Sequence, residues 1–191
     1  MKRHRSLVPL SHDHHHALVE ARRLCSAAEG PGSSTAASAF LQFYVSETVC
    51  HFRVEEEVLF PTVVELPEAR EPIIQALLQH QCIHARAAQL RDRLDDGRAL
   101  AEIMRELGGL LEAHVRHEER RLFPLIEGLL DDPTLAALQL GLSDRYDADD
   151  PQGAFSDRAT PADPGATLLF WGAGGGAQCD GAFLAKRRWS A

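Results

Sequence analysis

The sequence predicts an all-α protein, an antiparallel up-down-up-down four-helix bundle. Four long stretches within the first 123 residues repeat apolar side chains at three- and four-residue spacing, which is the period of an amphipathic helix. The connections between these stretches are short, and consecutive helices joined by short loops pack antiparallel. No segment before residue 167 resembles a strand, and the run at 167–171 is too short to found a sheet.

The first predicted helix covers about residues 10–28. Ser11 and Asp13 suit its first turn, and a connection rich in glycine and serine stops it. Its opening turns hold a histidine-rich run, which Asp13 interrupts and which merges into the helical period, so we treat it as native rather than as an expression tag. His14 lies on the apolar stripe, and His15 is the alternative if the inward face is slightly rotated.

The second predicted helix runs from about residue 36 to residue 60. Its apolar face carries Tyr44, His51 and Glu55, and the histidine and the glutamate stack one turn apart. Tyr44 lies two turns below the histidine and is interpreted as a core aromatic rather than as a gate of a site. Pro61 is expected to end or kink this helix.

The third predicted helix starts near Pro72, which suits a first turn, and an Asp-Asp-Gly run closes it. His80 and His84 lie on its inward face. The fourth predicted helix covers about residues 98–123 and carries His114 and Glu118 inward. A proline follows it, as one follows the second helix, and a last short turn or helix is expected to end near residue 140.

Composition divides the chain into a bundle, residues 1–140, and a low-complexity tail, residues 141–191, which is rich in Asp, Pro and Gly and is predicted to be disordered. The net charge of −8 argues against a nucleic-acid surface. Neither a membrane span nor a signal peptide is expected, and the four cysteines form no Cys-x-x-Cys pair, so we expect a cytoplasmic protein with reduced thiols.

One stretch occurs twice, as His-x-x-x-Glu-Glu-x-x-Leu-Phe-Pro at 51–61 and again at 114–124. The first and third helices contribute further inward histidines. Histidines and carboxylates are costly to bury unpaired in a hydrophobic bundle, so their convergence predicts a metal site. Its predicted members are His14, His51, Glu55, His80, His114 and Glu118.

The number and type of these donors bear on the metal. Six ligands exceed what a tetrahedral zinc site uses. Nitrogen and oxygen donors favour iron or manganese in a redox role, although zinc or copper would also bind in vitro. Carboxylates can bridge two ions, each of which would then be bound by imidazoles from two helices.

The two motif copies, together with an Asp-His-His stretch on the first helix and a Gln-His on the third, resemble the hemerythrin-like, or HHE cation-binding, family over about residues 7–130. The resemblance implies a four-helix bundle around a non-haem di-iron centre. By this resemblance the four histidines are terminal ligands of two iron ions and Glu55 and Glu118 bridge them. An oxo or hydroxo bridge completes the core and leaves a position for O2, NO or peroxide.

The third helix departs from one branch of that family. Oxygen-carrying hemerythrins place a His-x-x-x-His on this helix, as His80 and His84 do here. On their fourth helix, however, those carriers have an aspartate five residues after the histidine. Here Glu118 follows His114 by four residues, as in the repair and sensor branch. His84 is therefore either a fifth histidine ligand or an outer partner of a ligand. The motif neighbours fall off the inward stripe and are expected to be exposed charge: Glu56, Glu57, His117 and Glu119.

Three functional hypotheses follow. The first is a binding module whose di-iron centre binds O2 or NO, senses redox state or holds iron. The second is an enzyme in which that centre reduces peroxide or NO, or assists repair of iron–sulfur clusters. The third is a structural bundle with adventitious metal. By the resemblance, a signalling member would carry a recognisable output domain and a repair member a cysteine-rich N-terminal domain. The sequence shows neither, so we expect the binding module.

Overall fold

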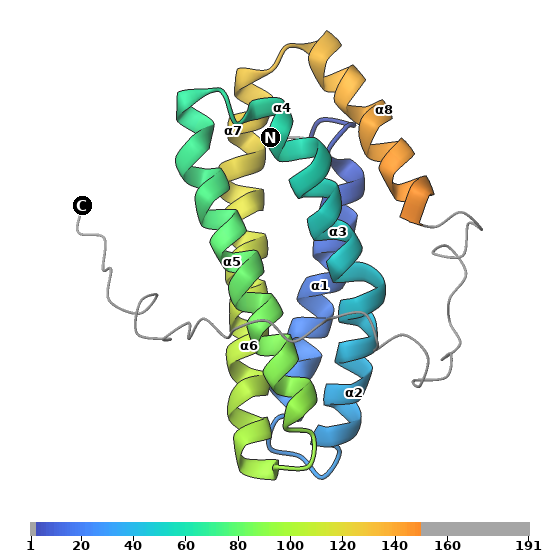
Figure 1. The fold of residues 1–191 in the computed structure, drawn as a ribbon, viewed down its shortest axis with the longest axis vertical. Helices are drawn as coiled ribbons and strands as arrows, with labels where there is room; N and C mark the ends of the chain where they lie inside the picture. The colour runs from blue at the N-terminus through green and yellow to red at the C-terminus, as the bar shows by residue number, and fades with distance from the viewer. Residues whose placement is uncertain (1–2, 150–191) are drawn as a thin grey trace. The chain divides into compact units, whose positions relative to one another are not determined.

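A computed structural model describes residues 3–149 of the chain. Over this range the protein is helical and contains no strand, so the predicted fold class is confirmed. Four helical runs form the bundle in up-down-up-down order, and a fifth helix follows them (Figure 1). The predicted tail beyond residue 149 lies outside the described residues.

The first run is α1 (Val8–Ala27), which begins close to its predicted start. Pro9 occupies its first turn, where the missing N–H costs nothing, and no side chain caps it. The sequence suggested that Ser11 and Asp13 serve the first turn of this helix. In the structure neither side chain caps it. Their side chains bond to groups of other helices instead, as described below.

The second run is continuous from Ser33 to Val63, but two widened π-helical turns interrupt its α-helical geometry. It consists of α2 (Ser33–Phe43), η1 (Tyr44–Thr48), α3 (Val49–Val54), η2 (Glu55–Leu59) and α4 (Phe60–Val63). The run continues past Pro61, which occupies the first turn of α4. A proline ring collides with the carbonyl four residues before it in an α-helix, and here the widened turn directly precedes it.

The third run, α5 (Pro67–Asp92), begins earlier than predicted. Leu66 has extended backbone angles, φ −79° and ψ 120°, and Pro67 then occupies the first turn. The expectation that Pro72 marks the start is wrong, since this proline lies inside the helix. Two prolines fit a helix start in this segment, and the sequence alone does not show which one the chain uses.

The fourth run joins α6 (Gly97–His117), η3 (Glu118–Leu122) and α7 (Phe123–Leu129), and Asp96 caps its start by accepting a hydrogen bond from the Ala99 amide. The last helix, α8 (Asp132–Asp149), lies beside α3 (Figure 1) and contacts α3 and η2. Its buried leucines belong to one of the apolar clusters described below. The helix therefore continues past the expected boundary at residue 141.

Apolar side chains form two separate clusters within the bundle. One cluster contains Leu24, Phe40 and Leu107, and the other contains Leu10, Leu59 and Phe123. The buried histidines and glutamates lie between them along each run: on α5, for example, His80 stands between Ala76 of one cluster and Ile83 of the other. Among the described helices, none combines the length and apolarity that a membrane span requires.

Candidate metal centre

Six titratable side chains from four helical runs converge between the two apolar clusters. All six are at most 5% exposed: His14, His51, Glu55, His80, His114 and Glu118. They are the six-member set predicted from the sequence. The inward direction of each pair follows from helix geometry, because residues four apart lie on one face.

Each of the two carboxylates lies between histidines of different helices. Glu55 Oε1 is 3.2 Å from His51 Nε2, and its Oε2 is 3.3 Å from His80 Nε2. Glu118 Oε2 is 3.0 Å from His14 Nε2 and 3.4 Å from His114 Nε2. Each carboxylate therefore lies within reach of imidazoles from two different helices, in a group that could hold a metal ion.

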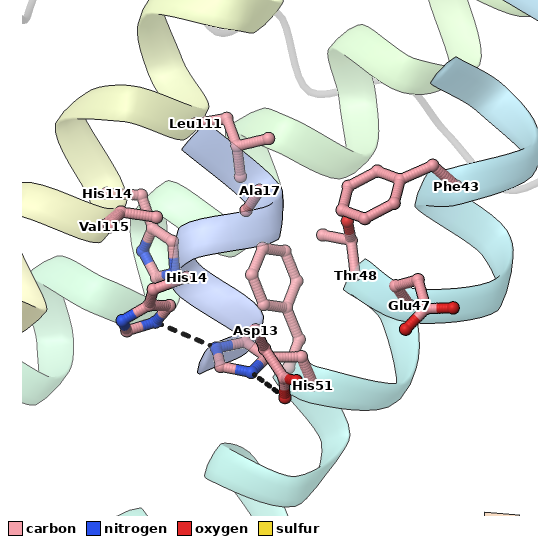
Figure 2. Close-up of a pocket in the computed structure, with 11 residues that line it drawn as sticks. Asp13, His14, Ala17, Phe43, Glu47, Thr48, His51, Leu111, His114 and Val115 are labelled. Carbon is pink, nitrogen blue, oxygen red and sulfur yellow. Dashed lines mark hydrogen bonds and ion pairs between the residues drawn. The ribbon is translucent and has the colours of Figure 1, made fainter. Parts of the chain in front are cut away.

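The histidines form two pairs. The ring centroids of His14 and His51 are 4.8 Å apart, and those of His80 and His114 are also 4.8 Å apart. The Nε2 atoms of His14 and His51 face each other at 3.0 Å (Figure 2). We call these the His14/His51 position and the His80/His114 position.

The donor atoms fit a cation better than they fit one another. Both oxygens of Glu55 and Glu118 and the Nε2 atoms of His80 and His114 are buried without a hydrogen-bond partner in the described part of the chain, since their close contacts lack hydrogen-bond angles. Two donors at about 2.1 Å from one ion lie roughly 3.0 to 3.4 Å apart for angles between 90° and 109°. The distances from 3.0 to 3.4 Å measured here fall in that range.

Two sets of four ligand atoms lie close enough to hold ions. In one set, atoms of His14, His51, His114 and Glu118 lie within 4.8 Å of one another. In the other, atoms of Glu55, His80, His114 and Glu118 do so. Imidazole nitrogens mixed with carboxylate oxygens suit transition metals such as iron, manganese or zinc.

Three of the four histidines have a carboxylate on the ring nitrogen that faces away from the centre. His14 Nδ1 is 2.8 Å from Glu119 Oε1, His51 Nδ1 is 3.1 Å from Asp13 Oδ2, and His80 Nδ1 is 2.7 Å from Glu56 Oε1. A carboxylate that accepts a hydrogen bond from Nδ1 would orient the ring so that Nε2 could bind a metal ion.

The expectation that Glu56 and Glu119 are merely exposed charge is wrong. Both are half-buried, with side chains 34% and 29% exposed. In each motif copy the first glutamate points to the centre, and the second bonds to a histidine of a neighbouring helix. The signal was present in the sequence, because both copies double the glutamate at the same place.

Both copies also share a local backbone feature. The π-helical turns η2 and η3 begin at Glu55 and Glu118, where the amides of Phe60 and Phe123 donate to the carbonyls five residues earlier. Such widened turns are frequent at functional sites. The sequence reasoning assumed regular α-helices and missed them.

Charges at the centre shift several pKa values. Burial alone would lower the pKa of His51, but the negative charge of Glu55 and the contact with Asp13 raise it well above its ordinary value. Burial likewise opposes protonation of His80, yet the close contact with the Glu55 carboxylate and the hydrogen bond to Glu56 raise its pKa to about 9. His114 differs, since burial lowers its pKa well below the usual 6.5. Metal binding requires deprotonated imidazoles, so protons compete with cations at His51 and His80.

Other predicted candidates lie outside the cluster. His84 belongs to neither set of ligand atoms and instead contacts the Tyr44 hydroxyl through Nδ1. His15 is exposed, so the structure brings His14 rather than His15 to the centre. Glu57 is exposed beside Arg145, as expected, whereas the half-buried His117 donates from Nε2 to the Pro72 carbonyl oxygen at 2.9 Å.

A small cavity adjoins the His14/His51 position. It has a volume of about 20 Å³, and its wall includes His14, His51, His114 and the apolar side chains of Phe43 and Leu111 (Figure 2). A cavity needs roughly 10 to 15 Å³ to hold one water molecule, so this one has room for a ligand of about that size.

Comparison with known proteins bears on this centre. The family model described as Hemerythrin HHE cation binding domain matches residues 6–126, which include all six buried donors. Searches of curated proteins and of solved structures found no match.

Proposed function

The chain belongs to the hemerythrin HHE cation-binding family, and from that premise we propose that its buried centre holds two iron ions and binds a diatomic ligand such as O2 or NO. One observation supports two ions above all others. Each of the two carboxylates lies within 3.4 Å of histidines from both positions. A single tetrahedral ion would leave at least two of the six buried donors uncompensated.

Iron is proposed because of the donor set. Mixed imidazole and carboxylate ligation suits iron or manganese, and bound iron would supply reversible redox chemistry and an open ligand position. The two buried glutamates offset cationic charge. The outer carboxylates keep the histidines oriented, and the two apolar clusters exclude bulk water from the donors. The cavity of about 20 Å³ restricts the ligand to a few atoms.

The small cavity thus selects the diatomic ligand by size, and the two buried glutamates favour cations by charge. Roles in oxygen or nitric oxide binding, redox sensing and iron handling all rest on such a centre. Reversible binding without turnover distinguishes these roles from an enzyme that consumes peroxide or NO.

The proposal is tested by loading the metal-free chain with Fe(II) under anaerobic conditions and measuring bound iron. About two ions per chain are expected. His14→Ala, His51→Ala and Glu118→Ala should each lower that number, whereas His15→Ala, an exposed neighbour on α1, should leave it unchanged. If the three ligand variants bind as much iron as the His15→Ala control, the assignment is wrong.

Stopped-flow exposure of the iron-loaded, reduced chain to O2, NO and peroxide then separates the two roles. Reversible spectral changes that follow ligand concentration are expected for a binding module. Catalytic consumption of peroxide or NO over many turnovers would instead identify an enzyme.

A further inference from the structure

The two histidine pairs are alike at the centre but differ around it. The ring centroids are 4.8 Å apart within each pair, and Glu55 and Glu118 each contact one histidine of each pair. Within the His14/His51 position each imidazole has a carboxylate on Nδ1. Within the His80/His114 position only His80 does, through Glu56, since His114 Nδ1 is buried without a hydrogen-bond partner among residues 3–149.

The sequence shows where the correspondence breaks. Asp13 immediately precedes His14 on α1 and contacts the partner histidine, His51. Gln79 immediately precedes His80 on α5, at the matching place. It is only 6% exposed, and its Oε1 also has no hydrogen-bond partner in the described range. In the sequence, a neutral amide thus occupies the position that corresponds to the Asp13 carboxylate.

A second difference is that Arg3 and Ser11, near the N-terminus, bond to Glu119. Arg3 donates to Glu119 Oε2 at 2.6 Å and to the Glu119 carbonyl at 3.1 Å, and the Ser11 hydroxyl donates to Glu119 Oε1 at 2.6 Å. Arg3 is itself held by Glu127 at 3.0 Å. Glu119 is therefore fixed in the orientation that holds His14.

These differences act on metal affinity through the orientation and basicity of the imidazoles. A carboxylate at Nδ1 fixes the ring orientation and makes the imidazole a stronger donor through Nε2. The His114 ring lacks that constraint. A neutral residue at position 79 also attracts a cation less than the Asp13 carboxylate does.

We propose that the two metal positions are inequivalent and that the His14/His51 position takes the first ion and binds it more tightly than the His80/His114 position. This rests on the proposed function of a two-ion centre. Loss of an outer partner changes metal affinity by about 10- to 100-fold, and we expect the two binding steps to differ by that factor.

The test is a titration of the metal-free, full-length chain with Co(II), followed by visible absorption. Two steps are expected in the wild type. His80→Ala should keep the tighter step and lose the weaker one, and His14→Ala should lose the tighter step. Asp13→Asn, which preserves shape, should weaken the first step about tenfold. Glu20→Gln, on the same helix and paired with Arg23, is the control and should change neither step.

Half-loaded wild-type protein provides a measurement that does not depend on folding of the variants. With one equivalent of Co(II), paramagnetically shifted proton signals should come from the His14 and His51 rings. Two ions bound with equal affinity, or first-step signals from His80 and His114, would overturn the inference while leaving the two-ion centre intact. Binding of fewer than two ions would overturn the proposed function itself.

Discussion

Replacement of Glu56 offers the sharpest test of how the second glutamate of each motif copy acts. Glu56→Gln keeps a hydrogen-bond acceptor of the same shape but removes its charge, and Glu56→Ala removes both. Glu57, the next residue in the same π-helical turn, is the matched control, because it is exposed and forms ion pairs with Arg53 and Arg145.

The expected magnitudes follow from the contact geometry. Glu56 Oε1 lies 2.7 Å from His80 Nδ1, and its side chain is 34% exposed. A hydrogen bond to a charged group contributes about 1.5 to 3 kcal/mol, and partial exposure places this one near the lower end. A tenfold loss of metal affinity corresponds to about 1.4 kcal/mol. We therefore expect Glu56→Gln to cost about tenfold and Glu56→Ala closer to a hundredfold.

Affinity is measured by competition between the protein and a chromophoric chelator for Fe(II) or Co(II), with circular dichroism to verify helix content. Glu57→Gln and Glu57→Ala should change affinity by less than about twofold, because the Glu57 side chain is 51% exposed and belongs to neither set of ligand atoms. If the Glu56 and Glu57 variants bind metal equally well, Glu56 does not orient His80 and the reasoning fails.

Three further predictions address His84, pH and helix packing. His84→Ala should retain two bound ions, because His84 lies outside both sets of ligand atoms, and a lower metal content by elemental analysis would identify it as a ligand. Without metal, the protonated His80 stabilises the fold fully below its ordinary pKa of 6.5, and this contribution is lost as pH rises through about 9, so the melting temperature of chelator-treated protein should fall over that interval while metal affinity rises. A melting temperature that rises steadily from pH 6.5 to 9 would contradict this assignment. Gly108→Ala should destabilise the fold by about 1 to 3 kcal/mol in chemical denaturation, because the added Cβ would collide with Cys25 Sγ and lie 2.9 Å from the Ala21 carbonyl oxygen, whereas Gly109→Ala, with nothing within 4 Å, should not. Equal stability of these two glycine variants would show that α1 and α6 can move apart at no cost.

Helix spacing accounts for the agreement between the predicted and observed centres. In each motif copy the histidine and the first glutamate are four residues apart, and this spacing directs both side chains to one face whatever the rest of the fold does. The apolar period then identifies that face as inward. For these reasons six buried donors on four helices could be named before any contact was known.

Contacts between distant segments account for the disagreements. The bond from Glu119 to His14 joins residues 105 positions apart, and the bond from Glu56 to His80 joins residues 24 apart. Neither glutamate lies on the apolar stripe of its own helix, so periodicity assigned both to solvent. The rotation of each helix against its neighbours decides whether such a residue reaches a partner, and single-helix patterns contain no information about that rotation.

The sequence by itself determined the all-helical fold, the histidine and glutamate candidates and the family, because these depend on local spacing and on a repeated motif. Only the tertiary structure decided which neighbouring charges orient the ligands, that His84 contacts the Tyr44 hydroxyl, and that His51 has a carboxylate on Nδ1 whereas His114 has no hydrogen-bond partner there among the described residues. These features depend on distances between helices, which packing sets and which no stretch of the chain encodes alone.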